Sequence, residues 1–314
     1  MKIIKKETIV AHYNAIPLEQ HIAAIADGFV SYSNGGANIP PVGHLKMIKP
    51  PGDIHIKYGS IDKVPNYVIK IASGFYENHS LGVPSSNGMM LAFNAQTGEP
   101  NTILLDEGFL TDVRTGLAGA VCAKHVGPKN IQKIGIVGTG VQARYQLKCL
   151  KGVTACKSVM VWGRNKEKAM NYQAEMAKEG YTVEIANTLE NLATSCNLIV
   201  TTTPSESPLI KGEWIMPGTH ITAVGSDTPG KRELDENVLT KADHIIADSV
   251  SQCLTQGEIQ HEKNENAIEL GSWISKNKTR SESAITVCDL TGVAVQDIVI
   301  ANSIIAQNNL KHED

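Results

Sequence analysis

A small-residue turn near the middle of the chain has the residue types and spacing of a phosphate-binding loop. Gly138, Gly140 and Ala143 occupy the three small-residue positions of a GxGxxG-type motif,. The first glycine permits a tight turn, the second lets a pyrophosphate approach the backbone, and the alanine lets a helix pack close to the preceding strand. The free N–H groups at the start of that helix would face the phosphates. The turn therefore predicts dinucleotide binding; the alternative is a strand–helix turn with incidental glycines.

The end of the next predicted strand, residues 159–162, indicates which dinucleotide is bound. Enzymes that use NAD usually place an acid there to hold the ribose 2′-hydroxyl. This chain has Gly163, Arg164 and Asn165 instead, and no acid before Glu167. A guanidinium can bind a 2′-phosphate through two parallel hydrogen bonds. We expect NADP(H) to be preferred, with NAD(H) as the alternative if Arg164 is a solvated charge or stacks on adenine.

A polar segment, Thr202-Thr203-Pro204, ends another predicted strand. At the carboxyl end of a parallel strand it would lie beside the ribose or the nicotinamide. The alternative is that the proline only terminates the strand.

Short apolar segments alternate with helical segments from residue 131 onwards, which is typical of a parallel, doubly wound sheet,. The predicted strands are residues 133–138, 159–162, 182–185, 198–202, 220–224, 244–247 and 284–288, and the predicted helices are residues 141–150, 166–178 and 189–195. The part before residue 116 is predicted to be mixed α+β. Its helices are expected at 18–33 and 111–125 and its strands at 54–58, 67–71, 89–93 and 102–105. A last helix at 293–308 is expected to return to this first part.

Composition excludes several classes of protein. The chain has 314 residues, 42% hydrophobic and 19% charged, with a net charge of −3, so it predicts globular domains without the basic surface that nucleic acid requires,. The six cysteines have no zinc-ligand spacing, so we expect no metal site and reduced thiols, as in a cytoplasmic protein,. The lysine-rich first residues lack a following apolar stretch and no apolar segment reaches membrane-spanning length, so we expect neither a signal peptide nor a membrane span,. The expected partner is a small molecule.

Five motifs, taken in order, resemble those of the ornithine cyclodeaminase/mu-crystallin family. They are Leu110-Thr111-Asp112-Val113-Arg114-Thr115-Gly116, Gly138 to Ala143, Ala223-Val224-Gly225-Ser226-Asp227-Thr228-Pro229-Gly230-Lys231, Gln256-Gly257-Glu258-Ile259 and Asp289-Leu290-Thr291-Gly292-Val293-Ala294. The resemblance covers nearly the whole chain. It implies a homodimer and an α/β fold that combines a doubly wound Rossmann domain, residues 117–293, with a discontinuous α+β dimerisation/substrate domain, residues 1–116 with 294–314.

The resemblance also implies roles for particular residues. Lys70 and Arg114 would bind the substrate carboxylate, for which a compact charge and a planar fork are suited. Asp227 would be the acid/base residue at the reacting carbon, with Lys70 as the second catalytic residue. The alternatives are an exposed lysine on a strand, a surface ion pair of Arg114 with Asp112 or Asp106, and an aspartate that caps a turn.

The cofactor-binding residues expected from the motifs and the strand ends form one set. They are Thr115, Gly138, Thr139, Gly140, Val141, Gln142, Ala143, Gly163, Arg164, Asn165, Thr202, Thr203, Pro204, Val224, Gly225, Asp227, Thr291 and Gly292.

One departure from the family pattern concerns the substrate. Ornithine cyclodeaminases carry a glutamate thirteen residues before the carboxylate-binding lysine, where this chain has Lys57. A cation there would repel the distal ammonium of ornithine. A position eleven residues earlier, usually arginine, corresponds to Lys46, which we also expect to bind substrate. Together these changes favour a substrate with a carboxylate and no distal ammonium, unless Lys57 points to solvent.

These residues predict an NAD(P)H-dependent reductase of small cyclic imino acids, with Δ1-pyrroline-2-carboxylate, which would yield L-proline, as the leading substrate. A first alternative is a cyclodeaminase or amino-acid dehydrogenase of the same family. A second, from another class, is a mu-crystallin-like, NADPH-linked binding protein.

Overall fold

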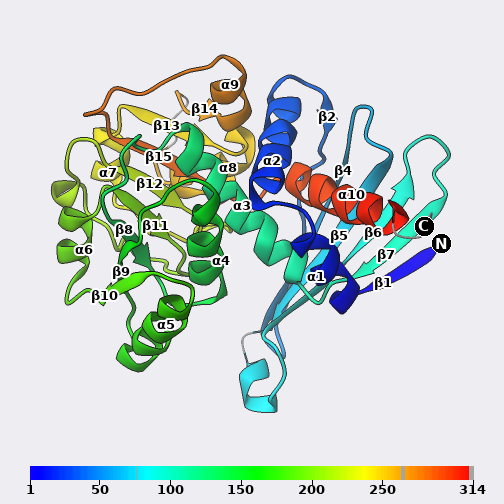
Figure 1. The fold of residues 1–314 in the computed structure, drawn as a ribbon, viewed down its shortest axis with the longest axis horizontal. Coiled ribbons are helices and arrows are strands. Elements are labelled where there is room, and N and C mark those ends of the chain that lie inside the picture. The colour runs from blue at the N-terminus through cyan, green and yellow to red at the C-terminus, as the bar shows by residue number, and fades with distance from the viewer. Residues whose placement is uncertain (76, 263–265, 311–314) are drawn as a thin grey trace. The chain divides into compact units, whose positions relative to one another are not determined.

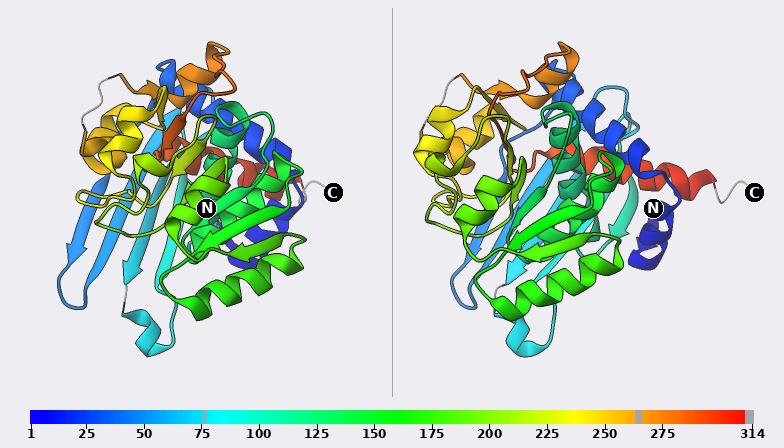
Figure 2. Two further views of the ribbon diagram at one scale, coloured as in Figure 1. Left: turned by 90° about the vertical axis from the view of Figure 1, so that its left-hand side faces the viewer. Right: turned by 60° about the vertical axis from the view of Figure 1, so that its left-hand side comes forward.

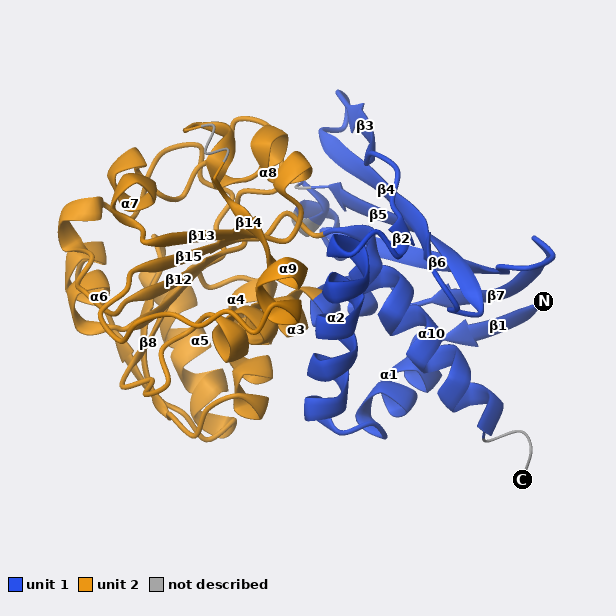
Figure 3. Ribbon diagram, turned by 90° about the horizontal axis from the view of Figure 1, so that it is seen from above, with its two compact units in different colours: residues 1–114, 293–314 blue, residues 115–292 orange. Residues whose placement is uncertain are grey.

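Two compact units make up the chain. The computed structural model describes residues 1–75, 77–262 and 266–310 (Figure 1). Unit 1 consists of residues 1–114 and 293–314, and unit 2 of residues 115–292 (Figure 3). The chain therefore begins in unit 1, forms unit 2 and returns to unit 1. Within the described ranges, no helix combines the length and the apolar character needed to cross a membrane.

Unit 1 is a mixed sheet with helices packed against it. Its strands are β1 (Lys2–Lys5), β2 (Ala37–Asn38), β3 (Gly43–Met47), β4 (Gly52–Ile61), β5 (Asn66–Phe75), β6 (Ser86–Asn94) and β7 (Pro100–Leu105). Its helices are α1 (Lys6–Asn14), α2 (Leu18–Ser33) and α10 (Ala294–Leu310), and α3 (Phe109–His125) continues into unit 2. Among the residues of unit 1 that the structure describes, the strand order is β1-β7-β6-β5-β4-β2, with β3 paired to β4, and only β1 and β7 run parallel.

The alternation of side chains along a strand gives this sheet one buried face. Val68 and Lys70 on β5, Met90 on β6 and Leu104 on β7 are all buried. Helix α10 packs on β4 and β5 and also contacts α2, so these helices supply the cover for that face (Figure 1). Successive residues of a strand point to opposite faces of the sheet, so Lys70 points to the same buried face as Val68 although its side chain is charged,.

Unit 2 contains a parallel sheet of the doubly wound kind. Its strands are β8 (Ile134–Val137), β9 (Ser158–Trp162), β10 (Thr182–Ile185), β11 (Leu198–Thr201), β12 (His220–Ala223), β13 (His244–Ala247), β14 (Ile268–Glu269) and β15 (Thr286–Asp289). Its helices are α4 (Val141–Cys149), α5 (Lys166–Lys178), α6 (Leu189–Ser195), α7 (Glu236–Lys241), α8 (Val250–Gln256) and α9 (Leu270–Ser275). The strand order among the described residues is β10-β9-β8-β11-β12-β15-β13-β14, with parallel pairing throughout.

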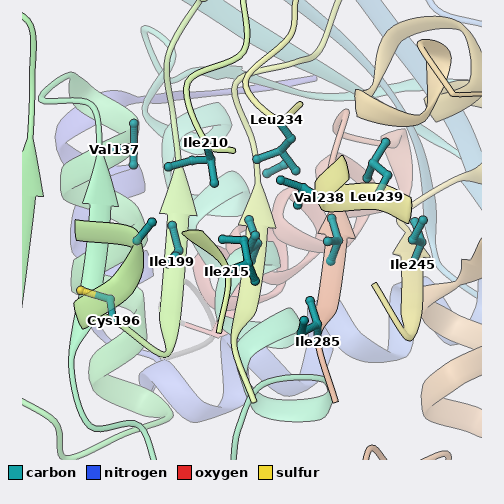
Figure 4. Packing of buried hydrophobic residues seen from close by; sticks show 14 of the residues in the cluster. Val137, Cys196, Ile199, Ile210, Ile215, Leu234, Val238, Leu239, Ile245 and Ile285 are labelled. Carbon is teal, nitrogen blue, oxygen red and sulfur yellow. The ribbon is translucent and has the colours of Figure 1, made fainter. Parts of the chain in front are cut away.

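Helices cover both faces of this sheet, which explains why its strands are continuously apolar. Helix α7 lies on one side, and α4 and α5 lie on the other (Figure 3). Helix α5 runs alongside β9 and β10 (Figure 2). On one face, Ile199, Ile210 and Ile285 belong to a cluster of buried hydrophobic side chains (Figure 4). Burial of this apolar surface holds the strand ends, and the loops that follow them, in place.

The expected fold class is confirmed, and most predicted elements lie within a few residues of the observed ones. The helix predicted at residues 18–33 is α2, and the strand predicted at 182–185 is β10. The last strand of unit 2 begins and ends later than the predicted 284–288, at Thr286–Asp289. The first strand and helix of the chain, and helices α7, α8 and α9, were not predicted because they are short and weakly patterned.

Candidate functional site

The small-residue turn has the conformation that its sequence indicates. Gly138 follows β8 with φ of +118°, and an added Cβ there would lie 2.5 Å from the hydroxyl of Thr202, so this position requires glycine,. Gly140 caps α4, and an added Cβ there would meet no atom of the described residues within 4 Å, apart from its neighbours in the chain. Ala143 is fully buried in the first turn of α4. The turn thus packs closely where helix meets strand and stays open where a ligand would approach.

A cavity of about 990 Å³ in unit 2 opens at this turn. Ten of the predicted cofactor residues line it, namely Gly138, Thr139, Gly140, Val141, Gly163, Arg164, Asn165, Thr202, Thr203 and Pro204. The remaining predicted cofactor residues, Thr115, Gln142, Ala143, Val224, Gly225, Asp227, Thr291 and Gly292, are not among its lining residues. The structure therefore gathers the residues of three separate strand ends around one space large enough for a small-molecule ligand.

Arg144 stabilises the turn through hydrogen bonds. The sequence alone did not identify this role. Its Nη1 donates to the carbonyl of Thr139 at 2.5 Å and to that of Gly140 at 3.1 Å. Its Nη2 donates to Glu175 at 3.0 Å, which neutralises an acid of the cavity wall. The guanidinium therefore ties both carbonyls of the turn to helix α4, and Arg144 itself lines the cavity. An arginine one turn into the helix after the motif is the signal that could have found it.

Arg164 and Lys168 are the exposed cations near the end of β9 that line the cavity. Asn165, between them, caps helix α5 by accepting a hydrogen bond from the N–H of Lys168 at 2.9 Å. The cap fixes where α5 begins, and so places Lys168 in its first turn, close in sequence to Arg164. This part of the wall carries positive charge.

Buried carboxylates hold the loops at the carboxyl edge of the sheet, and sequence reasoning gave none of them this role. Glu233 accepts hydrogen bonds from the hydroxyl of Thr201 at 2.6 Å, from the N–H and hydroxyl of Thr203 at 2.6 and 2.8 Å, and from the N–H of Gly225 at 2.8 Å. Burial raises the pKa of Glu233 to about 7, although these four donors act in the opposite direction. One side chain thus ties the segment after β11 to the segment after β12.

A second carboxylate, Asp248, fixes the loop after β15. It accepts hydrogen bonds from the N–H groups of Thr291 and Gly292, at 3.1 and 2.6 Å, and from the Thr291 hydroxyl at 3.1 Å. The predicted cofactor residues Thr291 and Gly292 are therefore held at a strand end, outside the cavity wall.

Two further buried acids, Glu258 and Asp289, connect these segments. Glu258 accepts from the N–H groups of Glu233 and Leu234, and Asp289 accepts from that of Ile259. Burial raises the pKa of both carboxyl groups, that of Asp289 to about 7.

Two predicted cofactor residues have other contacts. The carbonyl of Thr115, in α3, accepts a hydrogen bond from Gln146 of α4 at 2.9 Å. Asp227, the expected acid/base residue, follows β12 and pairs with Lys231 at 2.6 Å, with 46% of its side chain exposed. Its position at a strand end agrees with the position expected, and its carboxylate is accessible.

In unit 1, the two expected carboxylate-binding cations share one buried acid. Lys70 Nζ and Arg114 Nε each lie 3.1 Å from Oδ1 of Asp297, at the first turn of α10. Arg114 Nη1 also donates to Oε1 of Gln296 at 2.8 Å. All four residues are buried. The alternatives of an exposed lysine and of a surface ion pair for Arg114 with Asp112 or Asp106 are wrong, because Asp297 is the partner.

Lys57 belongs to the same cluster. It is paired with Lys70 across β4 and β5, and it is 8% exposed, so the alternative that it points to solvent is wrong. Burial and the nearby charge of Arg114 lower the pKa of Lys70 to about 7, and Lys57 acts in the same direction. Burial tends to raise the pKa of Asp297, but Lys70, Arg114 and Lys57 together hold it below its ordinary value.

Lys46 does not join this cluster. It lies exposed on β3 and is paired with Asp53, which is four residues from Lys57 along β4. That separation is about 13 Å at roughly 3.3 Å per residue. Asp297 and Gln296 were missed by sequence reasoning. A lone acid in the apolar segment Val295–Ile300 is the signal that could have found them,.

The sequence matches the ornithine cyclodeaminase/mu-crystallin family over residues 3–312. A Rhizobium meliloti protein with the provisional name of a dehydrogenase is 35% identical over 306 residues, which are 94% of this chain and 92% of that protein. An archaeal alanine dehydrogenase dimer with bound NAD has a similar structure, with a TM-score of 0.91, 29% identity and 99% and 97% of the two chains covered. Thermococcus litoralis Δ1-pyrroline-2-carboxylate reductase in complex with NADH and L-proline also gives a TM-score of 0.91, with 25% identity and 100% and 98% covered.

Proposed function

The chain belongs to the ornithine cyclodeaminase/mu-crystallin family as an NAD(P)-dependent oxidoreductase, and on that premise we propose that it reduces small cyclic imino acids, with Δ1-pyrroline-2-carboxylate as the leading substrate. The observation that carries this proposal is the buried cluster of Lys57, Lys70 and Arg114 around Asp297. The three cations face Asp297, and a second buried acid, Asp106, whose pKa is raised by burial, interacts with Lys70. The cations outnumber these acids and leave positive charge for a ligand. Burying such an excess is costly unless an anion compensates it.

The residues of unit 2 fit a dinucleotide. Gly140 lines the cavity and has open space at its Cβ position, so glycine there makes room for a ligand rather than for packing. The N-terminus of α4 supplies backbone N–H groups for a pyrophosphate,. Glu233 fixes Thr203 beside Thr202 and Pro204, which line the same cavity. When bound, the nicotinamide cofactor supplies the hydride.

The charge of the cavity wall supports a preference for NADP(H). Arg164 and Lys168 both line the cavity, and no acid stands at the end of β9 to hold a ribose 2′-hydroxyl,. A 2′-phosphate would have two cations near it. The two similar solved structures reported above contain NAD or NADH, so use of NAD(H) is the alternative that the experiment must compare.

The chain's own residues have three tasks in the proposed reaction. Lys70 and Arg114 bind the substrate carboxylate and so orient the neighbouring C=N carbon, which receives the hydride. The imine nitrogen takes one proton, and the products are the cyclic amino acid and the oxidised cofactor. Asp227 stabilises the protonated imine by its negative charge or through a bridging water, for which its exposed carboxylate is available,.

An amino-acid dehydrogenase that acts on alanine is the second candidate, favoured by the similarity to the archaeal alanine dehydrogenase. It differs in needing ammonia together with a 2-keto acid. An ornithine cyclodeaminase is disfavoured by the buried Lys57, which would repel the distal ammonium,. A binding protein of the mu-crystallin kind would bind NADPH and a small ligand without turning over any imine.

The test is a screen of NADH and NADPH oxidation with Δ1-pyrroline-2-carboxylate, Δ1-piperideine-2-carboxylate, and pyruvate with ammonia. The proposal expects the cyclic imines to be reduced with a kcat/KM at least about tenfold above that for pyruvate with ammonia, since the ammonia-dependent reaction must first form its imine. Turnover of pyruvate with ammonia alone would replace the leading function with the second candidate. Release of ammonia from ornithine without net cofactor oxidation would contradict both.

We also propose that the protein is a homodimer formed through the open face of the unit 1 sheet. Leu45, Ile56, Tyr58 and Met89 are exposed apolar side chains on β3, β4 and β6. An apolar sheet face of this kind favours association with a second copy. Light scattering at micromolar concentration measures the oligomeric state, and a monomer would contradict this part of the proposal.

A further inference from the structure

The acid inside the cationic cluster has an unusual position. A single oxygen of Asp297, Oδ1, lies 3.1 Å from both Lys70 Nζ and Arg114 Nε. The other oxygen, Oδ2, is buried and has no hydrogen-bond partner among the described residues. Helix α10 carries Asp297 and Gln296 in its first turn, and both side chains are 1% exposed. Asp297 is therefore held against the two cations by the helix.

We propose that Asp297 and Gln296 are positioning residues for carboxylate binding, with Asp297 keeping the Lys70 ammonium charged and both residues orienting the Arg114 guanidinium. This inference rests on the proposed function, because it takes Lys70 and Arg114 as the groups that bind the substrate carboxylate. Neither Asp297 nor Gln296 needs to touch the substrate for this role.

The orientation of Arg114 follows from its contacts. Its Nη1 donates to Gln296, and its Nε lies 3.1 Å from Oδ1 of Asp297 in an ion pair that lacks hydrogen-bond geometry. Nη2 makes no hydrogen bond to the described residues and is not used by either contact. A guanidinium is planar, so the hydrogen bond of Nη1 together with the ion-pair contact at Nε sets the direction of Nη2. The pair on α10 thus presents Nη2 to an incoming anion, and it removes the rotational freedom that binding would otherwise have to restrict.

The charge of Lys70 follows from the groups around it. Arg114 from α3 and Lys57 from β4 oppose its protonation, whereas Asp297 from α10 favours it, and buried Asp106, between β7 and α3, also interacts with it. Burial raises the pKa of Asp106, which weakens that carboxyl as a counter-ion. Asp297, whose pKa is held low, is therefore the main counter-ion of Lys70. Without it, a desolvated lysine between two cations would lose its proton at neutral pH.

This arrangement makes the affinity for a carboxylate fall as the pH rises. The pKa of Lys70 is lowered to about 7, so the charged ammonium is present below that pH and is lost as the pH rises through it. A bound carboxylate is a second anion next to Lys70 and would raise its pKa, so binding takes up protons near and above neutral pH. The affinity for a carboxylate should therefore be highest in mildly acidic solution.

A purely structural role is the competing explanation: Asp297 could serve only to anchor α10 to the sheet. Removing a buried ion-pair partner would then reduce stability and affinity without changing the pH at which affinity is lost. The pH midpoint separates the two explanations.

The experiment uses pyrrole-2-carboxylate, a planar carboxylate that cannot accept a hydride, as the probe in calorimetric titrations of the full chain between pH 5.5 and 9. For Asp297→Asn we expect affinity at pH 7 to fall by about tenfold or more, and the midpoint of its pH dependence to move down by about one unit. Asp297→Glu keeps the charge and should retain the wild-type midpoint. Gln296→Ala should weaken binding with no change of midpoint, because it removes a neutral acceptor.

Glu107→Gln is the matched control, because it removes the acid of an exposed ion pair with Lys6 in the same unit, and it should leave probe binding unchanged. NADPH affinity, measured by fluorescence, should stay within about twofold in every variant, because none of the three changed residues lines the cavity of unit 2,.

An unshifted midpoint in Asp297→Asn, with the wild type binding the probe, overturns the charge-setting role and leaves the proposed function standing. Affinity in Gln296→Ala equal to that of the wild type overturns the orienting role. If Asp297→Asn does not fold, the midpoint of Asp297→Glu decides: a shift as large as one unit overturns the charge-setting role, and retention of the wild-type value supports it. Failure of the wild type both to bind the probe and to reduce any cyclic imine overturns the proposed function, and this inference with it.

Discussion

Lys57 on β4 lies directly across from Lys70 on β5, and both side chains are buried on the same face of the sheet. Directly opposed residues of adjacent strands have their Cβ atoms about 5 Å apart, so two like charges there repel each other. The protein keeps this repulsion within a cluster that contains Asp297. A bound anion would reduce the repulsion between the two lysines, so this repulsion favours the binding of an anion.

Removal of the Lys57 charge should therefore move the pH dependence of carboxylate binding in the opposite direction to removal of Asp297. In Lys57→Met, we expect the pH at which pyrrole-2-carboxylate affinity is lost to rise by about half a unit, because one repelling charge next to Lys70 is gone,. Titration calorimetry across pH measures it. Lys5→Met, which removes an exposed lysine on β1, is the control and should behave as wild type. A midpoint that falls would contradict the proposed coupling of the two lysines.

Arg164→Ala should reduce the use of NADPH selectively. We expect the KM for NADPH to rise about tenfold, the loss expected when a charge-assisted contact to a 2′-phosphate is removed, while the KM for NADH changes less than twofold. Steady-state kinetics with both cofactors is the measurement. Lys166→Ala changes an exposed cation on α5 that does not line the cavity, so it should leave both values unaltered. Equal changes for NADPH and NADH would remove the 2′-phosphate role of Arg164.

Asp227→Asn should slow turnover much more than it weakens cofactor binding. A general acid or base at the reacting atoms contributes roughly 10²- to 10⁴-fold to the rate. The carboxylate of Asp227 is partly exposed, so its loss should have little effect on the stability of the fold. Imine reduction rates and NADPH fluorescence titrations give the two quantities. Glu236→Gln, which changes an exposed acid at the start of α7, serves as the control. Comparable losses of turnover and of cofactor affinity would point to a structural aspartate that holds Lys231.

Glu233→Gln should loosen the loops that follow β11 and β12. An amide nitrogen would face donors that now meet a carboxylate oxygen, and an unsatisfied buried donor costs about 1–3 kcal/mol,. We expect a lower free energy of unfolding and weaker NADPH binding, measured by urea titration and fluorescence. Glu190→Gln, an exposed acid on α6, is the control. Unchanged stability and affinity would show that these loops do not depend on Glu233.

The same glutamate should make stability depend on pH. Its folded pKa is raised to about 7, above the unfolded value, so its contribution to stability is fully present below the unfolded pKa and is lost as the pH rises through 7,. The full change from this group, from below the unfolded pKa to above pH 7, amounts to about 3 kcal/mol, of which about 2 kcal/mol falls between pH 5.5 and 8,. Urea titrations of the wild type at pH 5.5 and 8 should show the loss, and Glu233→Gln should reduce it. A variant with the full wild-type pH dependence would assign the effect to Asp289, whose pKa is also raised to about 7.

The glycine turn and the strands around it could be predicted because each depends on neighbours in the sequence. The positive φ of Gly138 favours glycine, and the apolar segment before it is buried on both faces of the sheet,. Both features can be recognised from the local sequence alone. Strand β1 is different. Its partner is β7, about 100 residues later in the chain, and four residues with two lysines show no pattern that predicts this pairing.

The types and order of the chemical groups were thus determined by the sequence alone: a phosphate-binding turn, an arginine where an acid usually stands, and lysines at positions 57 and 70. Only the tertiary structure decided their environment. Lys70, Arg114 and Asp297 are separated by up to 227 residues, and they meet because α10 returns to the sheet of unit 1. Charges interact through space and according to burial, so neither the counter-ion of Lys70 nor its lowered pKa could follow from spacing along the chain,.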